Sequence, residues 1–77
     1  MASTERTQPI HGEMITLGQL IKVLNLVSSG AEVKEFLARE QVRVNGQIDN
    51  RRGRKLFHGD VIEFEDSAAI RLVPQRF

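Results

Sequence analysis

The first hydrophobic period along the chain has the spacing of a helix. Four apolar residues recur at positions i, i+3, i+4 and i+7, namely Leu17, Leu20, Ile21 and Leu24. Such a stripe predicts an amphipathic helix with one face in the core. Thr16, followed three residues later by Gln19, has the pattern of a capping box and marks the start of this helix. Lys22 lies off the stripe and is expected to face solvent.

A second stripe with helical spacing follows a predicted turn at residues 25–30. Its apolar members are Val33, Phe36 and Leu37. Ser29 and Glu32 again match a capping box and predict where the second helix begins. Lys34 points away from the stripe. Two short helices joined by a short turn predict a helical hairpin or a helix-turn-helix.

After the second helix the period changes from helical to alternating. Val42 and Val44 flank Arg43, which predicts a strand with the arginine on its outward face. The Asn45-Gly46 dipeptide that follows is the strongest short signal for a hairpin turn. A strand of this kind, directly after two helices, indicates that the chain changes from helical to sheet structure here.

Alternation returns at residues 61–65 and 69–73, which predict two more strands. Met14 and Ile15 are expected to add a short edge strand before the first helix. These patterns together predict an α+β domain, in which a helical hairpin is followed by a small, mostly antiparallel sheet.

The first residues of the chain show no apolar period. Residues 1–12 are polar and contain Pro9, so they predict a flexible N-terminal tail. Residues 13–77 are then expected to form a single domain, because the whole chain has only 77 residues. A chain this short buries only about 60% of its unfolded surface, so its core must be small.

Composition removes several classes of function. Apolar residues make up 40% and charged residues 27% of the chain, which is usual for a folded globular domain. The chain has no cysteine, so disulfides, thiolate metal sites and cysteine nucleophiles are excluded. No apolar run approaches the roughly 20 residues of a membrane span, and no signal peptide is expected. These features favour a cytoplasmic protein without a metal, a cofactor or a catalytic site.

The net charge of +1 hides an uneven distribution of charge. Residues 39–58 hold six basic and two acidic residues, whereas the rest of the chain holds five basic and eight acidic ones. Four of the cations fall within five positions, at Arg51, Arg52, Arg54 and Lys55. Such a run can be a solvated loop, but arginine forks match phosphate oxygens, and a phosphate-binding loop is the favoured interpretation.

Two residues beside the basic run are open to two interpretations. Phe57 could stack on a nucleic-acid base, although core packing is favoured for it. His58 could touch a phosphate or a base, although a histidine in a loop more often has no such role. No nucleotide-binding glycine motif is present, and the serines at positions 28 and 29 are better explained by helix capping than by catalysis.

The pattern of two short helices followed by the sequence Val-Arg-Val-Asn-Gly at residues 42–46 resembles the S-four RNA-binding domain, which is named after the fourth protein of the small ribosomal subunit. The run Asn-Arg-Arg-Gly-Arg-Lys at residues 50–55 and the opening at residues 15–19 are similar to a subfamily of short, stand-alone bacterial members. The resemblance covers about residues 13–73.

This resemblance implies two helices laid against a bent sheet in an L shape, with a binding face for structured RNA. Lys34 matches a helix position that faces RNA in the family, and Arg43 is the variable residue of the valine motif. The basic run matches the basic loop of the short subfamily. With Lys22 of the first predicted helix added, there are seven candidate RNA-binding residues: Lys22, Lys34, Arg43, Arg51, Arg52, Arg54 and Lys55.

We therefore expect a small, monomeric, non-catalytic protein that docks on structured RNA of the ribosomal or transfer RNA class. Two alternatives remain open. One is a protein-interaction adaptor of ubiquitin-like type, although the chain ends in Pro-Gln-Arg-Phe instead of the Gly-Gly that a sulfur carrier needs. The other is an accessory subunit that guides an RNA-modifying enzyme, which would use the same RNA face.

Overall fold

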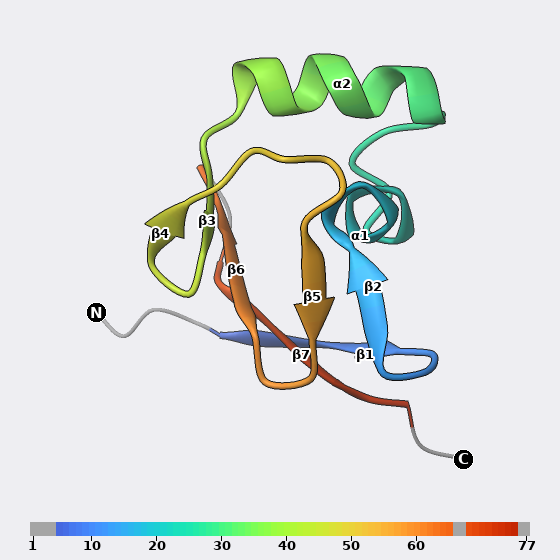
Figure 1. Ribbon diagram of the computed structural model, residues 1–77, viewed down its shortest axis with the longest axis vertical. Coiled ribbons are helices and arrows are strands. Elements are labelled where there is room, and N and C mark those ends of the chain that lie inside the picture. The colour runs from blue at the N-terminus through green and yellow to red at the C-terminus, as the bar shows by residue number, and fades with distance from the viewer. Residues whose placement is uncertain (1–4, 66–67, 76–77) are drawn as a thin grey trace.

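A computed structural model describes residues 5–65 and 68–75 of the chain. Within these residues the chain forms two helices and seven strands (Figure 1). Helix α1 spans Leu17–Val23 and helix α2 spans Gly30–Arg39. In Figure 1, α2 lies across the top of the molecule, α1 lies below it on the right, and the strands run below α2. This arrangement confirms the predicted α+β class.

Five strands make one mixed sheet in the spatial order β1-β7-β6-β3-β4. Their bounds are Arg6–Ile10 for β1, Ile70–Pro74 for β7, Val61–Phe64 for β6, Val42–Val44 for β3 and Gln47–Ile48 for β4. All neighbours in this sheet are antiparallel except β1 and β7, which run parallel. The remaining strands, β2 (Met14–Thr16) and β5 (Lys55–Phe57), form a separate antiparallel pair.

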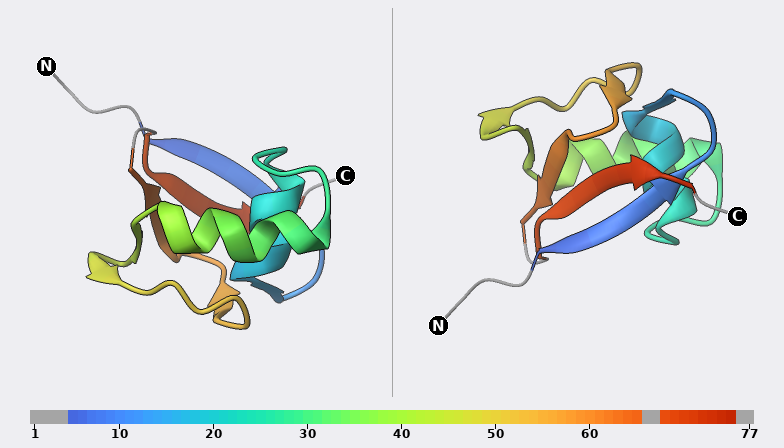
Figure 2. Two further views of the ribbon diagram at one scale, coloured as in Figure 1. Left: turned by 90° about the horizontal axis from the view of Figure 1, so that it is seen from above. Right: turned by 90° about the horizontal axis from the view of Figure 1, so that it is seen from below.

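The expectation of a flexible tail over residues 1–12 is wrong for β1. Residues 6–10 pair along their whole length with β7, and Ile10 lies in the core. Seen from below in Figure 2, β1 and β7 lie side by side across the molecule. Because the partner strand lies at the other end of the chain, no local pattern signals this pairing. The first four residues of the expected tail lie outside the described part of the chain.

The start of α1 follows the predicted capping box. The Gln19 backbone N–H donates to Oγ1 of Thr16 at 3.2 Å, and the Thr16 backbone N–H donates to Oε1 of Gln19 at 3.0 Å. The second predicted box does not form. Ser29 stands at the N-cap of α2 but makes no side-chain cap, and Glu32 instead accepts a 2.6 Å hydrogen bond from the Ser28 backbone N–H.

The core lies between the helices and the sheets and contains both helical stripes. Its fully buried members include Leu17, Leu20, Ile21, Val33, Val42, Leu56, Ile62 and Leu72. Phe36 of α2 meets Phe64 of β6 in an edge-to-face contact, with ring centroids 5.9 Å apart and planes at 65°. Phe57 was expected in this core, but half of its surface is exposed (50%) because its neighbour Leu56 takes the inward position on β5.

The predicted hairpin turn at Asn45-Gly46 joins β3 and β4. Both residues have positive φ, 52° and 86°, which is the backbone that this dipeptide favours. The Asn45 amide also reaches the next turn, where it donates to Oδ1 of Asp60 at 3.1 Å and accepts from the Val61 N–H at 2.9 Å. The Asn45 side chain therefore connects two turns.

We expect the substitution Ile10→Ala to destabilise the protein by about 2–4 kcal/mol, because it removes a buried side chain and leaves a cavity. The milder substitution Ile10→Val should cost about 1 kcal/mol. Urea unfolding of both variants tests this, with the exposed Thr7→Ala on the same strand as a matched control. A flexible tail would instead leave all three variants as stable as the wild type.

Candidate nucleic-acid interface

The basic run lies in the segment that follows β4 and ends at the first residue of β5. We call residues 49–55 the basic loop. Its backbone is bonded to the first turn of α1. The Leu17 N–H donates to the Arg54 carbonyl at 2.8 Å, and the Gly18 N–H donates to the Arg52 carbonyl at 2.9 Å. The first N–H groups of a helix have no partner within it, so the loop satisfies two donors of α1 and is fixed by them.

The same loop is bonded to the end of the other helix. The side-chain amide of Asn50 donates to the Leu37 carbonyl at 2.6 Å and to the Glu40 carbonyl at 2.8 Å. These carbonyls lie at the C-terminal end of α2, where helical carbonyls lack partners within the helix. The basic loop is thus held between the N-terminus of α1 and the C-terminus of α2 (Figure 1).

Asp49 organises two of the arginines. Its carboxylate is nearly buried (8% exposed) and accepts from Nε and Nη2 of Arg51 at 3.0 and 2.8 Å, and from Nη1 of Arg54 at 2.7 Å. It also accepts from the Arg51 backbone N–H at 3.0 Å. Hydrogen bonds from Arg51, and then from Arg54, hold the pKa of Asp49 well below its ordinary value despite the opposing effect of burial.

This ion-pair cluster changes the electrostatics expected of the run. One negative charge at Asp49 offsets part of the repulsion among the four cations. Arg51 remains largely exposed (73% of its side chain), whereas Arg54 is more enclosed (32%). Asp49 binds the Nε–Nη2 edge of Arg51, so within the described contacts its Nη1 group remains available for another acceptor. The loop is therefore preorganised and still cationic.

Arg52 runs between the two helices. A Cβ atom placed on Gly18 would lie only 3.0 Å from Cγ of Arg52, and one placed on Gly30 would lie 3.8 Å from its Nη2 atom. Because glycine has no side chain, position 18 leaves room for the arginine against the first turn of α1. The Arg52 side chain thus extends from the loop across α1 toward the start of α2.

Arg52 brings both predicted helix lysines into one cationic surface. It borders a hollow of about 250 Å³ that also contains Gly18 and Lys22. On its other side it borders a hollow of about 400 Å³ that contains Lys34 of α2 and Asn50. Lys22 and Lys34, which are twelve positions apart in sequence, therefore flank the same arginine.

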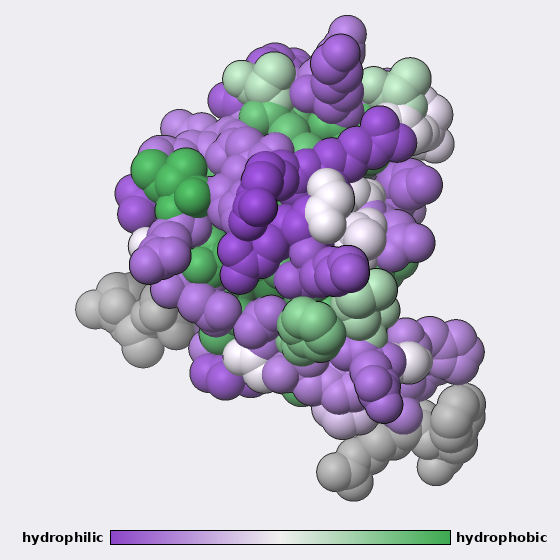
Figure 3. All heavy atoms as spheres, in the orientation of Figure 1, coloured by the Kyte–Doolittle hydropathy of each residue, from purple (hydrophilic) through white to green (hydrophobic). Residues whose placement is uncertain are grey.

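A third hollow, of about 600 Å³, lies at the end of the basic loop. It is lined by Arg51, Gly53, Arg54, Lys55 and Phe57. Figure 3 shows strongly hydrophilic side chains gathered at the centre of this face, over the loop, with a paler hydrophobic patch below them. Six of the seven predicted site residues thus line three hollows around the basic loop.

Arg43 lies apart from these six residues. It is on the outward face of β3, where its cross-strand neighbours are Ile48 on β4 and Glu63 on β6. None of the three hollows around the basic loop includes it. Glu63 places an opposite charge at the position directly across the sheet from Arg43, and a role of Arg43 in binding stays a prediction.

Sequence reasoning missed the residues that hold the cations in place. The sequence pattern assigned no role to Asp49 or to Asn50. The available signal was the position of Asp49, an acidic residue two and five positions before arginines in an otherwise cationic run. His58 has a local partner, because its Nε2 atom lies 2.9 Å from the Gly12 carbonyl.

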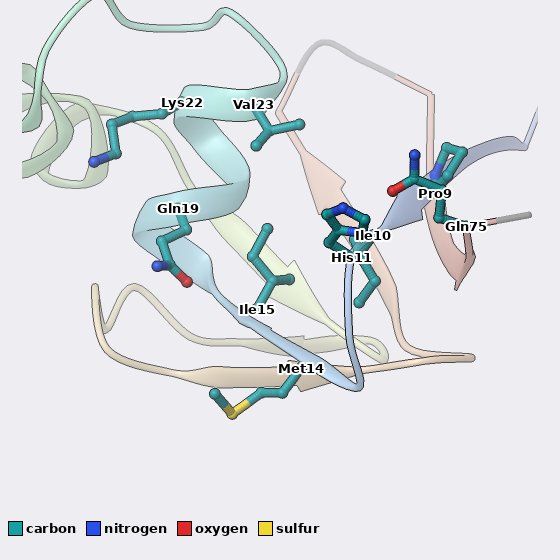
Figure 4. Close-up of a pocket in the computed structure, with 9 residues that line it drawn as sticks. All are labelled: Pro9, Ile10, His11, Met14, Ile15, Gln19, Lys22, Val23 and Gln75. Carbon is teal, nitrogen blue, oxygen red and sulfur yellow. The ribbon is translucent and has the colours of Figure 1, made fainter. Parts of the chain in front are cut away.

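A more apolar hollow of about 530 Å³ lies on another side of α1 (Figure 4). Ile15 points into it, whereas Met14 points to the other side of β2. Gln19 and Lys22 of α1 also line this hollow. Among residues 5–65 and 68–75, no cluster of three or more metal-ligating side chains occurs, and no helix is both long and apolar enough to cross a membrane.

Two comparisons with known proteins bear on this surface. The family model described as "S4 domain" matches residues 8–73, which include the second half of β1, from Gln8 on, and both helices. The chain is also 48% identical over 64 residues to the protein named "Probable ribosome maturation protein RlbA" of Bacillus subtilis (strain 168). That alignment covers 83% of this chain and 90% of the relative.

The lowered pKa of Asp49 makes stability depend on pH in acid. A carboxylate with a lower pKa in the folded state stabilises the fold above its unfolded pKa of about 3.9, and this contribution is lost as the pH falls toward the folded value. We expect Asp49→Asn to lower the free energy of unfolding by about 2 kcal/mol at pH 7. The difference from the wild type should shrink below pH 4.

Urea unfolding from pH 7 to pH 2 measures both curves. The comparison is internally controlled, because the two proteins share every other carboxyl group. A difference that stays constant across this range would mean that the charge of Asp49 does not stabilise the loop.

Proposed function

Because the chain belongs to the S4 domain family, we propose that it is a non-catalytic RNA-binding protein whose target is structured ribosomal RNA. The observation that carries this proposal is the fixation of the basic loop between the two helices. A loop that is already ordered loses little conformational entropy when it binds, so its cations can act together on one ligand.

The chemistry of the surface favours the phosphate backbone as its ligand. Arg51, Arg52 and Arg54 present guanidinium groups, which bind phosphate oxygens through parallel hydrogen bonds, and Lys55 adds a compact charge. Lys22 and Lys34 extend this surface along the helices on either side of Arg52. Such spacing suits the backbone of a folded RNA, where A-form helices hide their major-groove edges and expose phosphates and 2′-hydroxyls.

The relative named as a ribosome maturation protein supports ribosomal RNA over transfer RNA as the target. We therefore place the protein's action at an assembling or assembled ribosomal particle, in the cytoplasm. The protein would act there as a monomer, either alone or beside an enzyme that modifies RNA. In both cases its own contribution is binding, through the residues around the basic loop.

Binding to a structured ribosomal RNA fragment should depend strongly on salt. If about four phosphates are neutralised, the logarithm of the affinity should fall against the logarithm of the salt concentration with a slope of roughly −3 to −4. Arg52→Gln should weaken binding and reduce the slope by about 1. Its fold should survive, because the backbone carbonyl of Arg52, and not its side chain, accepts the bond from Gly18.

Fluorescence anisotropy titrations across a salt series measure these slopes. Arg39→Gln is the matched control, since Arg39 lies on another face of α2 and lines a hollow with Glu32 and Glu35. A slope near zero, or equal losses in both variants, would count against the proposed surface. A transfer RNA bound more tightly than the ribosomal fragment would instead reassign the target.

A further inference from the structure

The hollow beside Phe57 has a feature that phosphate binding alone does not explain. We propose that it takes one unpaired nucleotide of the target RNA, with the base stacked on the Phe57 ring and the phosphate held by the neighbouring cations. This inference rests on the proposed function and adds to it a class of RNA structure. Such a nucleotide site requires an exposed Phe57 ring on a fixed backbone, cationic side chains beside the ring, and a hollow large enough for a nucleotide.

The ring of Phe57 is exposed although it belongs to a paired strand. Half of its surface is accessible (50%), and Met14, its cross-strand partner on β2, is also exposed. On β5, Leu56 is fully buried and lies between Lys55 and Phe57 in sequence. Because side chains alternate along a strand, Lys55 and Phe57 point to the same outward face. Burying this phenylalanine would stabilise so small a domain, so its exposure needs another explanation than folding.

The backbone that carries this ring is held on both sides. The Phe57 N–H donates to Oδ2 of Asp60 at 2.9 Å, and β5 pairs with β2 over all three of its residues. The next residue, His58, contacts the Gly12 carbonyl through its ring nitrogen. A stacking platform of this kind is preorganised, because only the side-chain torsions of Phe57 remain to be fixed on binding.

The rest of the hollow is cationic, which selects the occupant. Arg51, Arg54 and Lys55 line it together with Phe57 and Gly53. Three cationic side chains on the walls favour an anionic occupant, because guanidinium and ammonium groups bind phosphate oxygens through charge-assisted hydrogen bonds. A nucleotide matches both parts, since its base has an apolar face and its phosphate is an anion.

The size of the hollow and the geometry of RNA further restrict which nucleotides can occupy it. The hollow of about 600 Å³ is within the range of about 300–1,000 Å³ that accommodates small ligands. Bases inside an A-form helix are stacked on their neighbours, so their faces cannot meet a side chain, whereas bulged and loop bases are free to do so. The occupant is therefore an unpaired base next to a paired segment that the rest of the basic loop contacts.

Two RNA hairpins test this inference, one fully paired and one identical except for a single bulged nucleotide. The wild-type chain should bind the bulged hairpin about tenfold more tightly, which corresponds to about 1.4 kcal/mol. Phe57→Leu keeps an apolar side chain but removes the ring, and it should abolish this preference while leaving affinity for the paired hairpin unchanged. Leu26→Ala, at another exposed apolar position, is the matched control and should keep the preference.

A second measurement reports stacking directly. The chain contains no tryptophan, so Phe57→Trp introduces a single fluorophore at the proposed platform. Its fluorescence should be quenched by the bulged hairpin and much less by the paired one. Far-UV circular dichroism of each variant confirms that the fold is retained.

The outcomes separate this inference from the proposed function. If the wild type binds both hairpins equally and Phe57→Leu changes neither affinity, the nucleotide site is overturned while RNA binding stands. If Phe57→Leu weakens both hairpins alike, the ring acts on the paired RNA and the inference is also wrong. If the wild type binds neither hairpin in low salt and binds no ribosomal fragment, the proposed function itself fails.

Discussion

The carboxylate of Asp49 is the contact around which the cationic surface is built. It is nearly buried, it bonds two arginines that lie on opposite sides of Gly53, and it accepts a backbone N–H of the same loop. Without it, four cations in five positions would repel one another more strongly, and Arg51 and Arg54 would lose the acceptor that orients their guanidinium groups. With it, the guanidinium groups of Arg51 and Arg54 are oriented before any ligand arrives. The negative charge of Asp49 lowers the net positive charge of the loop, but it fixes the orientation of Arg51 and Arg54.

The basic loop is also part of the fold. Its carbonyls complete the first turn of α1, and Asn50 bonds the last carbonyls of α2, so the loop connects the two helices at opposite ends of their dipoles. Gly18 fits this arrangement, because any side chain at that position would press on Arg52. Asp49 and Asn50, at the start of the loop, make hydrogen bonds that hold it in place, whereas the candidate binding residues Arg51, Arg52 and Lys55 follow them and are exposed.

The parts of this structure that could be predicted from sequence are those set by neighbouring residues. The stripes of both helices, the capping box at Thr16 and the Asn45-Gly46 turn depend on spacings of a few positions, and all are present. Strand β1 could not be found, because its partner is distant in sequence and Pro9 suggested irregular chain. The exposure of Phe57 was missed for a related reason: the β2–β5 pairing that turns Leu56 inward is set by register, which the local pattern did not reveal.

The parallel pairing of β1 with β7 has a consequence for the order in which the molecule assembles. It joins residues 6 and 70, so it closes almost the largest loop that the chain allows, and such contacts form slowly. The hydrogen bonds described above that position the basic loop all lie between residues 14 and 57. The contacts among the helices and the basic loop therefore close shorter stretches of chain than the pairing of β1 with β7 does. A nascent or refolding chain is expected to acquire its cationic surface first and to add β1 to the sheet in a later, slower kinetic step.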